Sequence, residues 1–312
     1  MTTMLHLDTP TDTDTGATRT LVLPTRRRRP KTRAASVSRP GRAPRSVTAV
    51  KWIVLAVAIL LAVLPVLYMV AMSFKSPDDI LSTRILPTRL AVENWVSAFQ
   101  NWPILTYLRN SLGTGLVAVA VSLLISVPAN YAIARLRVGG ERVLGFIVSA
   151  YVAPPVVAII PLFVLVRTAG LMDSVVGLGI VQGLLLTPVA VWLLDGFFRA
   201  IPREIDEAAQ IDGCGPLRAL WKVILPLVAP GLVAVSIIVF ILVYNDFLIP
   251  LLLTQSAESQ TLPVGISLMQ GGREVMFGQT AAASLAGLLP VYLLALLLQK
   301  WLIGGLTQGS VK

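Results

Sequence analysis

The chain has 312 residues, of which 55% are hydrophobic and only 13% are charged. A mean hydropathy of +0.77 leaves too little polar surface for a soluble globule of this size, so the composition predicts a membrane protein. The single cysteine, Cys214, and the single histidine, His6, exclude an intramolecular disulfide, metal sites built from His and Cys, and histidine-based catalytic triads.

Residues 1–50 are polar and basic, and we predict that they form a disordered tail in the cytosol. Most of the net charge of +10 lies in this tail, including the run Arg26–Arg29. Because the run precedes a hydrophobic segment, we favour a tail that sets topology near anionic lipids over a nucleic-acid or nuclear-localisation patch. The hydrophobic segment that follows is too long for a secretory signal and predicts a retained membrane helix.

A segment of about 20 apolar residues crosses a hydrocarbon core of about 30 Å as a helix. Prolines inside several such segments predict bent helices. We therefore predict an all-α membrane protein in which residues 51–312 form one transmembrane domain. Its six predicted transmembrane helices are 52–72, 112–134, 143–166, 176–198, 228–252 and 281–303.

The distribution of Lys and Arg predicts the orientation of these helices. If the N-terminus is cytosolic, most of the basic residues fall on the cytosolic side, as the positive-inside rule requires. An even number of spans then returns the C-terminus to the cytosol. The same orientation places the polar loop between the fourth and fifth spans inside the cell.

That loop lies within GFFRAIPREIDEAAQIDGCGPLRALWKVILPLVAP, residues 196–230. Pro202 suits the first turn of a helix, residues 203–211 are mostly good helix formers, and Gly213 offers a left-handed stop. We predict a second helix that ends at Pro226. The two helices would form a bracket across the membrane face.

The first of these two helices carries the side chains expected to meet a partner protein. Ala208 and Ala209 lack bulk and would let the helix settle into a groove, while Asp206 and Glu207 supply carboxylates for basic or backbone donors. An ordinary interfacial loop is the alternative interpretation of Glu-Ala-Ala alone. The candidate residues of the loop are Asp206, Glu207, Ala208, Ala209, Asp212, Gly213, Leu225 and Pro226.

The order Glu207-Ala208-Ala209, Asp212-Gly213 and Leu225-Pro226 resembles the cytosolic coupling loop of ATP-binding-cassette (ABC) importer permeases. The chain is most similar to the six-span permease of maltose-type, binding-protein-dependent sugar importers. It departs from that subgroup at Tyr244, where Trp is more frequent, and in its long basic tail. Further segments that resemble the carbohydrate-importer subgroup are Gly196–Arg199, Met72–Lys75, Glu93–Trp95, Asn110–Leu112, Tyr131–Arg135, Pro161–Phe163, Asn245–Phe247, Leu262–Gly265 and Gly305–Lys312.

The resemblance implies a multi-pass cell-membrane subunit with a cytosolic coupling helix between the fourth and fifth spans. Its implied partners are a second, unlike permease, two ATP-binding subunits and an extracytoplasmic solute-binding protein. The chain has no GxxxxGK[ST] phosphate loop, so we expect a non-catalytic subunit without a cofactor or metal, and ATP-Mg bound by the partner ATPase. The implied cargo is a sugar or sugar-like solute. A phosphate ester, a polyamine or a peptide is the alternative cargo.

Polar residues in the outer half of the fifth span are candidates for a translocation pathway. They could form a sugar-stacking wall, or they could hold helices together, because a buried acid in a membrane requires a partner or water. These residues are Tyr244, Asn245, Asp246 and Phe247. We expect Gln182 to join helices and Asp195 to be an interfacial or interhelical group rather than a proton relay.

Two extramembrane segments complete the prediction. Apolar residues at helical spacing over 92–99 predict an amphipathic helix on the membrane surface. Residues 254–280 predict a flexible loop, which by resemblance reaches toward the binding protein. A secondary transporter or channel, and a membrane-embedded enzyme, are the rival classes. Both are disfavoured, because the spans carry few ionisable groups and no evident nucleophile or metal constellation.

Overall fold

A computed structural model describes residues 45–80, 82–152, 155–270 and 276–308, and the regular structure within these ranges is helical. The chain divides into two units, residues 1–55 and 56–312. Residues 1–44 of the predicted tail lie outside the described residues. The first helix already starts at Arg45, inside the range predicted as a tail.

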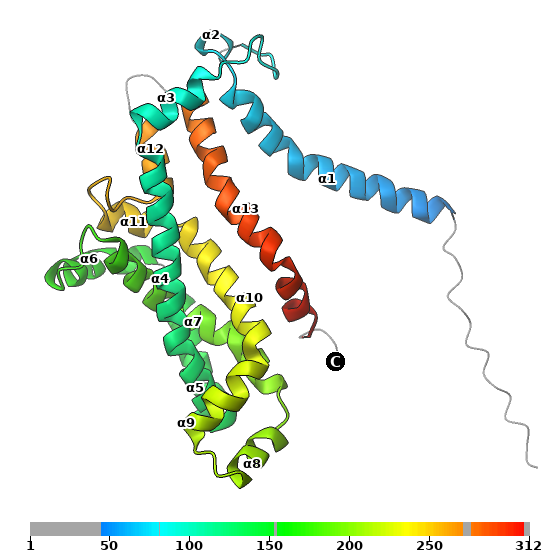
Figure 1. Cartoon of the computed structure of the whole chain (residues 1–312), viewed down its shortest axis with the longest axis vertical. Helices are drawn as coiled ribbons and strands as arrows, with labels where there is room; N and C mark the ends of the chain where they lie inside the picture. The colour runs from blue at the N-terminus through cyan, green and yellow to red at the C-terminus, as the bar shows by residue number, and fades with distance from the viewer. Residues whose placement is uncertain (1–44, 81, 153–154, 271–275, 309–312) are drawn as a thin grey trace, which may run out of the picture. The chain divides into compact units, whose positions relative to one another are not determined.

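Thirteen α-helices and three short π- or 3₁₀-helical segments make up the described chain (Figure 1). They are α1 (Arg45–Ser73), α2 (Pro77–Ile80), α3 (Glu93–Asn101), α4 (Ile104–Asn130), η1 (Tyr131–Arg135), α5 (Gly140–Val152), η2 (Pro155–Ala158), α6 (Ile159–Thr168), α7 (Val175–Ala200), α8 (Glu204–Ile211), α9 (Pro216–Ala219), η3 (Leu220–Ile224), α10 (Leu225–Tyr244), α11 (Leu248–Leu253), α12 (Leu262–Gln270) and α13 (Phe277–Gln308).

Five helices of the described ranges are long and apolar enough to cross a membrane. They cover the predicted spans 52–72, 112–134 and 176–198, and most of 228–252 and 281–303. The five stretches are Val50–Ser73, Ile104–Arg135, Val175–Ala200, Pro216–Tyr244 and Phe277–Leu297.

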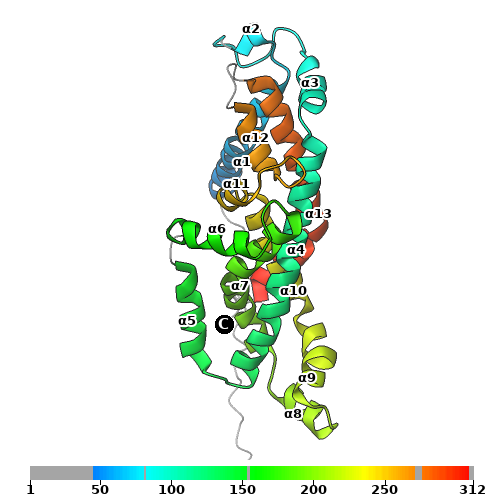
Figure 2. The ribbon, with the colours of Figure 1, turned by 90° about the vertical axis from the view of Figure 1, so that its left-hand side faces the viewer.

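The predicted span 143–166 is not a single continuous helix. Its residues belong to α5 and α6, with the 3₁₀ turn η2 between them, and the two α-helices run in different directions (Figure 2). Pro155 starts the turn. A proline has no N–H to donate to the preceding turn of a helix, which explains why no α-helix runs through Pro155.

The predicted end of a helix at Pro226 is wrong, because α9, η3 and α10 form one continuous helical stretch from Pro216 to Tyr244. Pro226 lies in the first turn of α10. In the widened turn before it, the Leu225 N–H donates to the Leu220 carbonyl, five residues earlier. The missing N–H of Pro226 is therefore accommodated by a local π-turn rather than by a helix end.

The outer end of the same predicted span, 228–252, is also interrupted. Helix α10 stops at Tyr244 and α11 begins at Leu248. Pro250 explains the gap, since its ring would clash with the carbonyl of Asp246 if the helix continued. The polar residues of this predicted span lie at a break between two helices.

Helices α4 and α7 form the central packed pair of the second unit, and α10 packs against both of them. Two glycines of α7 permit the close approach. A Cβ at Gly179 would lie 2.6 Å from the Val117 side chain, and one at Gly183 would lie 2.7 Å from the Ala118 carbonyl oxygen. Small residues of this kind are typical of tight helix pairs in membranes. Helix α13 packs in turn against α10.

The predicted flexible loop 254–280 is wrong where helices replace it, because Leu262–Gln270 form α12 and α13 begins at Phe277. Polar groups of α4 hold residues 254–262. The Asn110 amide donates to the carbonyls of Ala257 and Gln260, at 3.2 and 2.9 Å, and the Ser111 hydroxyl accepts the Leu262 N–H. Residues 271–275 lie outside the described residues.

Asp173, in the turn before α7, anchors the same segment. Its carboxylate accepts the backbone N–H groups of Gln255 and Ser256, at 2.8 and 2.9 Å, and the Ser259 hydroxyl. Desolvation alone would raise the pKa of Asp173, but the hydrogen bonds from Ser256, Ser259 and Gln255 outweigh it and lower that pKa below its ordinary value.

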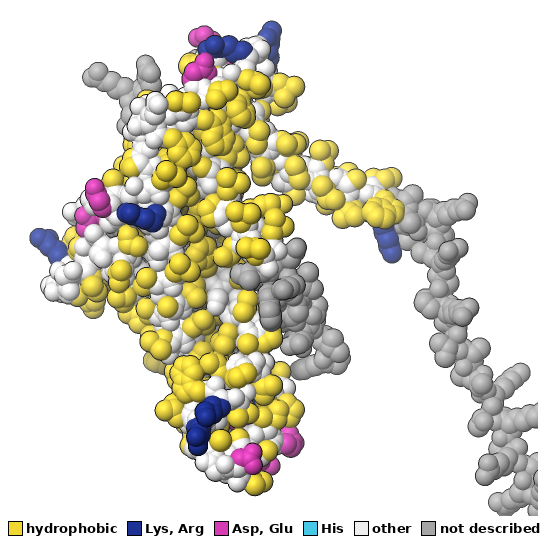
Figure 3. Space-filling view, viewed as in Figure 1, with side chains coloured by type: hydrophobic (Ala, Val, Ile, Leu, Met, Phe, Trp, Pro, Cys, Tyr) yellow, Lys and Arg dark blue, Asp and Glu magenta, His cyan; other side chains and the backbone are white. Residues whose placement is uncertain are grey.

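Helix α3 contains the predicted amphipathic segment. Val92 and Val96 are exposed, Trp95 is half-buried and Ala98 is fully buried. The Asn94 amide donates to the carbonyls of Ser73 and Lys75 and so ties α3 to the end of α1. Charged side chains gather near α2 and near α8 and α9, at opposite ends of the second unit, and a third group lies near α6; hydrophobic side chains cover much of the remaining face (Figure 3).

Candidate functional site at the junction of α7 and α8

The loop singled out by the sequence contains the short helix α8, which is bounded by non-helical residues on both sides. Helix α7 ends at Ala200, and Ile201 is extended. At the other end of α8, Gly213 has φ +77° and confirms the predicted left-handed stop. The Gly213 N–H donates to the Gln210 carbonyl, and the Cys214 N–H donates to the Ala209 carbonyl. This pair of bonds is a Schellman motif, which satisfies the last carbonyls of the helix.

Helix α8 has one face toward the protein and one face away from it. Glu207 and Ala208 are exposed, whereas Ala209 is buried and Asp206 is half-buried. Ile205 packs against the core cluster that contains Tyr131 of η1. The structure therefore separates the four central candidates into an outward pair and an inward pair.

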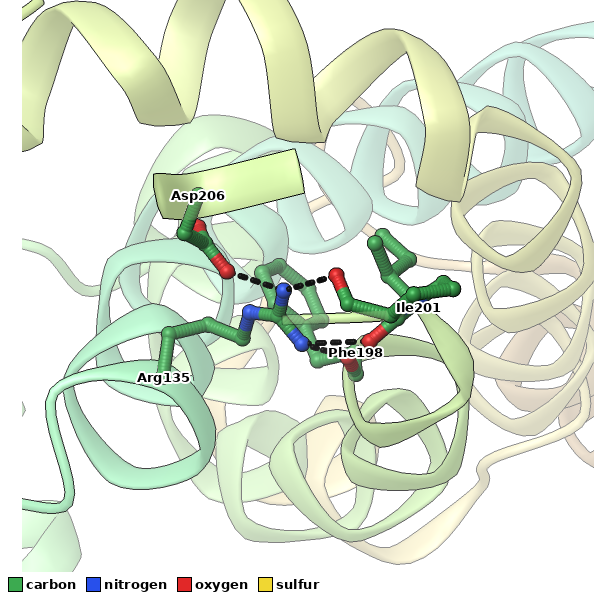
Figure 4. Close-up of polar contacts among 5 residues, drawn as sticks. Arg135, Phe198, Ile201 and Asp206 are labelled. Atoms are coloured by element: carbon green, nitrogen blue, oxygen red, sulfur yellow. Dashed lines mark hydrogen bonds and ion pairs between the residues drawn. The ribbon is translucent and has the colours of Figure 1, made fainter. Parts of the chain in front are cut away.

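Arg135, the last residue of η1, joins α8 to the end of α7 (Figure 4). Its guanidinium donates to the carbonyls of Phe198 and Ile201, at 3.3 and 2.7 Å, and to that of Pro202 at 3.0 Å. It also forms an ion pair with the Asp206 carboxylate. We call this arrangement of Arg135 with the three carbonyls and Asp206 the Arg135 clasp.

The charges of the clasp suit the helix ends at which they lie. The last carbonyls of α7 carry the negative end of the helix dipole, which favours a cation, and Asp206 lies in the first turn of α8, where an anion is favoured. The side chains of Arg135 and Asp206 are only 4% and 16% exposed. Because both groups are largely removed from water, each depends on the other for neutralisation.

The remaining loop residues lie at the surface or within the helix that follows. Asp212 and Gly213 are exposed, while Leu225 and Pro226 belong to the first turn of α10. Beside them the chain exposes large apolar side chains, among them Ile211 and Trp221. A shallow hollow here is lined by Gly215, Pro216, Leu217, Arg218 and Trp221.

The second candidate region lies at the other end of α10, about 30 Å away along a helix of this length. The buried Tyr244 donates its hydroxyl to the Gly287 carbonyl of α13 at 2.8 Å. Asp246 accepts a 2.7 Å hydrogen bond from the Gln182 amide of α7 and another from the Leu248 N–H. Phe247 is exposed. Tyr244 and Asp246 thus hold helices together, and the prediction that Gln182 joins helices is confirmed.

In the sequence, Arg135 is one of the basic residues on the predicted cytosolic side and ends the segment Tyr131–Arg135 that resembles the carbohydrate-importer subgroup, but it is not among the predicted site residues. Its position could have identified it as a site residue, because an arginine at the end of an apolar span either reaches water or pairs with an acid. Asp195 pairs with Arg199 one turn later on α7, at 2.7 Å. Among the residues that the structure describes, no group of His, Cys, Asp and Glu side chains could hold a metal ion.

Comparison with known proteins adds to this geometry. The family described as "Binding-protein-dependent transport system inner membrane component" matches residues 132–306. The chain belongs to this family. The match covers the clasp, the whole loop and the second candidate region, so both candidate regions lie in the part of the permease that the family shares.

Two relatives align over most of the permease. The diacetylchitobiose uptake system permease protein DasC of Streptomyces coelicolor is 37% identical over 255 residues, which is 80% of this chain and 92% of the relative. The trehalose transport system permease protein SugB of Mycobacterium tuberculosis is 35% identical, over 80% of this chain and 93% of the relative.

A solved structure shares the fold. A chain of a bacterial ABC transporter involved in the import of the acidic polysaccharide alginate superimposes with a TM-score of 0.68 at 25% identity. The superposition covers 83% of this chain and 97% of that chain. The all-helical arrangement of the permease is therefore that of an ABC transporter subunit.

Proposed function

We propose that this chain is the permease subunit of an ATP-driven ABC importer that carries a sugar or sugar-like solute delivered by an extracytoplasmic binding protein. The family and the transport systems named for its relatives support this proposal. The chain would pair with a second permease and with two ATP-binding subunits, which bind and hydrolyse ATP-Mg. It would not be an enzyme itself.

The proposed topology has six spans, with α5 and α6 together forming the third, and both termini in the cytosol. The concentration of basic residues on that side supports it. Cys214 tests the topology directly, because it is the only cysteine of the chain and is partly exposed in the loop. A membrane-impermeant maleimide should label it in inverted vesicles and not in intact cells. Labelling from the outside would reverse the orientation.

The proposed docking surface for an ATP-binding subunit is the outward face of α8, with Glu207 and Ala208, together with the neighbouring apolar hollow. This proposal is supported by the exposure of these residues at the α8 and α9 end of the bundle, where charged side chains gather. Asp206 and Ala209 are not included, since they face the permease itself. Closure of the ATP-binding subunits would displace α8 and switch the spans between inward-open and outward-open states.

We propose a translocation-pathway role only for the exposed members of the second region, Asn245 and Phe247, and for the carboxylate of Asp246. The break between α10 and α11 and the exposure of Phe247 support this assignment. Non-helical backbone at membrane depth is tolerated where it is covered by protein or lines a water-filled cavity. Tyr244 would support the pathway without touching the solute.

Affinity purification of the tagged chain from its own membranes tests the proposed function. We expect an ATP-binding subunit and a second permease to co-purify, and the ligand extracted from the associated binding protein to be a carbohydrate. Glu207→Ala should leave the chain in the membrane but reduce recovery of the ATP-binding subunit. Absence of any ATP-binding subunit from the parent preparation would refute the proposal. A phosphate ester, polyamine or peptide in the binding protein would correct the cargo alone.

A further inference from the structure

Helix α8 is connected to the bundle by links that are not helical. Residues 201–203 precede it and residues 212–215 follow it, so both links offer rotatable backbone. Apart from the packing of Ile205 against the core cluster and the burial of Ala209, a helix of eight residues on two such links would be free to rock when pushed. Its displacement would then be absorbed by the links instead of moving the spans.

The Arg135 clasp opposes this rocking at three places. Its guanidinium binds the Phe198 carbonyl in the last turn of α7, the Ile201 and Pro202 carbonyls in the link, and Asp206 in the first turn of α8. Arg135 itself belongs to η1, which continues α4. One planar cation therefore fixes α8 to both helices of the central pair.

A guanidinium suits this task because its five donors have a fixed planar geometry. An ammonium group in the same place has no such fork and would hold the link less rigidly. We infer that Arg135 is a positioning residue for transport: it turns a hinged α8 into a rigid lever, so that a push on α8 reaches α4 and α7. This inference rests on the proposed function.

Two residues must be changed together to test the lever without exposing a buried unpaired charge. Removing one partner of a buried ion pair is destabilising, whereas replacing both by apolar residues of similar size is often neutral. The test variant is therefore Arg135→Met with Asp206→Leu. The matched control is Arg199→Met with Asp195→Leu, since Arg199 is 42% exposed and its ion pairs are with Asp195 of α7 and Glu141 of α5.

The assembled importer, with Cys214→Ser, provides the measurement. Spin labels at the exposed positions Ile211 of α8 and Leu124 of α4 report whether α8 is rigid. Labels at Leu105 of α4 and Leu289 of α13, also exposed, report whether movement reaches the spans. Distances are recorded without nucleotide and after trapping with MgATP and vanadate.

We expect the parent and the control pair variant to keep a narrow Ile211–Leu124 distance in both states and to change the Leu105–Leu289 distance on trapping. The test variant should retain its ATP-binding subunits but show a broad Ile211–Leu124 distance. After trapping, some molecules show the changed Leu105–Leu289 distance and others keep the original one. In the test variant the ratio of the first population to the second should be about fivefold or more lower than in the parent, as for a typical loss of allosteric coupling. Arg135→Lys should lie between the parent and the test variant.

The opposing results are distinct. If the test variant keeps the narrow Ile211–Leu124 distance and the full Leu105–Leu289 change, Arg135 only stabilises the fold and the lever is overturned. If the test variant fails to accumulate, Arg135→Lys decides: behaviour equal to the parent in both distances also overturns the lever. If no ATP-binding subunit accompanies the parent chain, the proposed function itself fails.

Discussion

Two charged side chains hold the chain together at opposite ends of α7, and they do so in opposite ways. Beyond the end of α7, Arg135 donates to three carbonyls and to a carboxylate. Before its start, Asp173 accepts two backbone N–H groups and a hydroxyl. The first group is almost fully buried, and the second lies in an exposed turn.

Arg135 and Asp173 differ in how far their charged groups are buried, and this difference decides how much each substitution should cost. Arg135 has lost its water and is paired with Asp206, because a buried charge is costly unless it is neutralised and hydrogen-bonded. Asp173 remains in contact with water, which screens its charge and weakens each of its interactions. We therefore expect single substitutions to reduce stability strongly at the Arg135 clasp and only weakly at Asp173.

The largest expected effect is that of Arg135→Met alone. This change leaves the Asp206 carboxylate unpaired in a buried place and should cost about 3–5 kcal/mol of stability. The double variant Arg135→Met with Asp206→Leu should recover most of this loss. Thermal unfolding of the purified protein in detergent measures both. A single variant as stable as the parent would mean that Asp206 is solvated, and the contrast between the two ends would disappear.

A smaller effect is expected at Gly213, whose positive φ ends α8. Gly213→Ala should cost about 1 kcal/mol or more, since a side chain is strained in this conformation. Gly213→Pro should disrupt α8 itself, because proline cannot adopt a positive φ, and should reduce recovery of the ATP-binding subunit.

The control for Gly213 is Gly196→Ala in α7, where an added Cβ meets no atom within 4 Å. This substitution should be neutral or slightly stabilising, because alanine is the better helix former. Thermal unfolding and co-purification compare the variants. Equal effects at the two glycines would show that the stop at Gly213 has no special role.

At the end of α10 that lies away from α8, substitutions of Asp246 and Gln182 should have modest structural effects. Interhelical hydrogen bonds in membranes are worth about 0.6 kcal/mol on average and about 1.7 kcal/mol at most. Gln182→Leu removes only the contact between helices, whereas Asp246→Asn removes the charge and keeps an acceptor. If Asp246 lines the pathway, Asp246→Asn should alter uptake kinetics while assembly stays intact, and Gln182→Leu should not. Loss of assembly in Asp246→Asn would assign Asp246 a structural role only.

The smallest effect is expected at Asp173, and it depends on pH. Asparagine also tolerates the positive φ of 54° found there, so Asp173→Asn isolates the charge. We expect a loss of about 1 kcal/mol or less at neutral pH, because the group is exposed. The folded pKa of Asp173 is lowered, so its contribution is complete above the unfolded pKa of about 3.9 and is lost as the pH falls below it.

Thermal unfolding at a series of pH values checks this prediction. The difference in Tm between the parent and Asp173→Asn should be constant from pH 7 to about pH 5 and shrink below about pH 4. A difference that instead grows on acidification would show that the carboxylate destabilises the folded chain.

The sequence predicts the apolar helices well, because lipid requires long uninterrupted runs of hydrophobic residues that composition reveals directly. The sequence does not predict which prolines interrupt a helix and which ones the helix accommodates. Pro155 and Pro250 interrupt predicted spans, whereas Pro226 is absorbed by a π-turn, and hydropathy cannot distinguish these outcomes.

The candidate site was predicted as a segment but not in its internal organisation. The Glu-Ala-Ala motif identifies α8, but it does not reveal that Asp206 pairs with Arg135, which lies 71 residues earlier in the chain. Such a long-range ion pair leaves no local pattern in the sequence. The same limit applies to the segment 254–270, which Asn110 and Asp173 hold from distant parts of the chain.

The central claim is that the outward face of α8 contacts an ATP-binding subunit. Neighbouring alanines give the most direct test, since Ala208 is exposed and Ala209 is 5% exposed. Each is replaced by cysteine in a Cys214→Ser chain, coupled to a benzophenone maleimide, and irradiated in the assembled importer. We predict a cross-link to the ATP-binding subunit from position 208 and little or none from position 209. Absence of a cross-link from position 208, or equal cross-linking from both, would contradict the account.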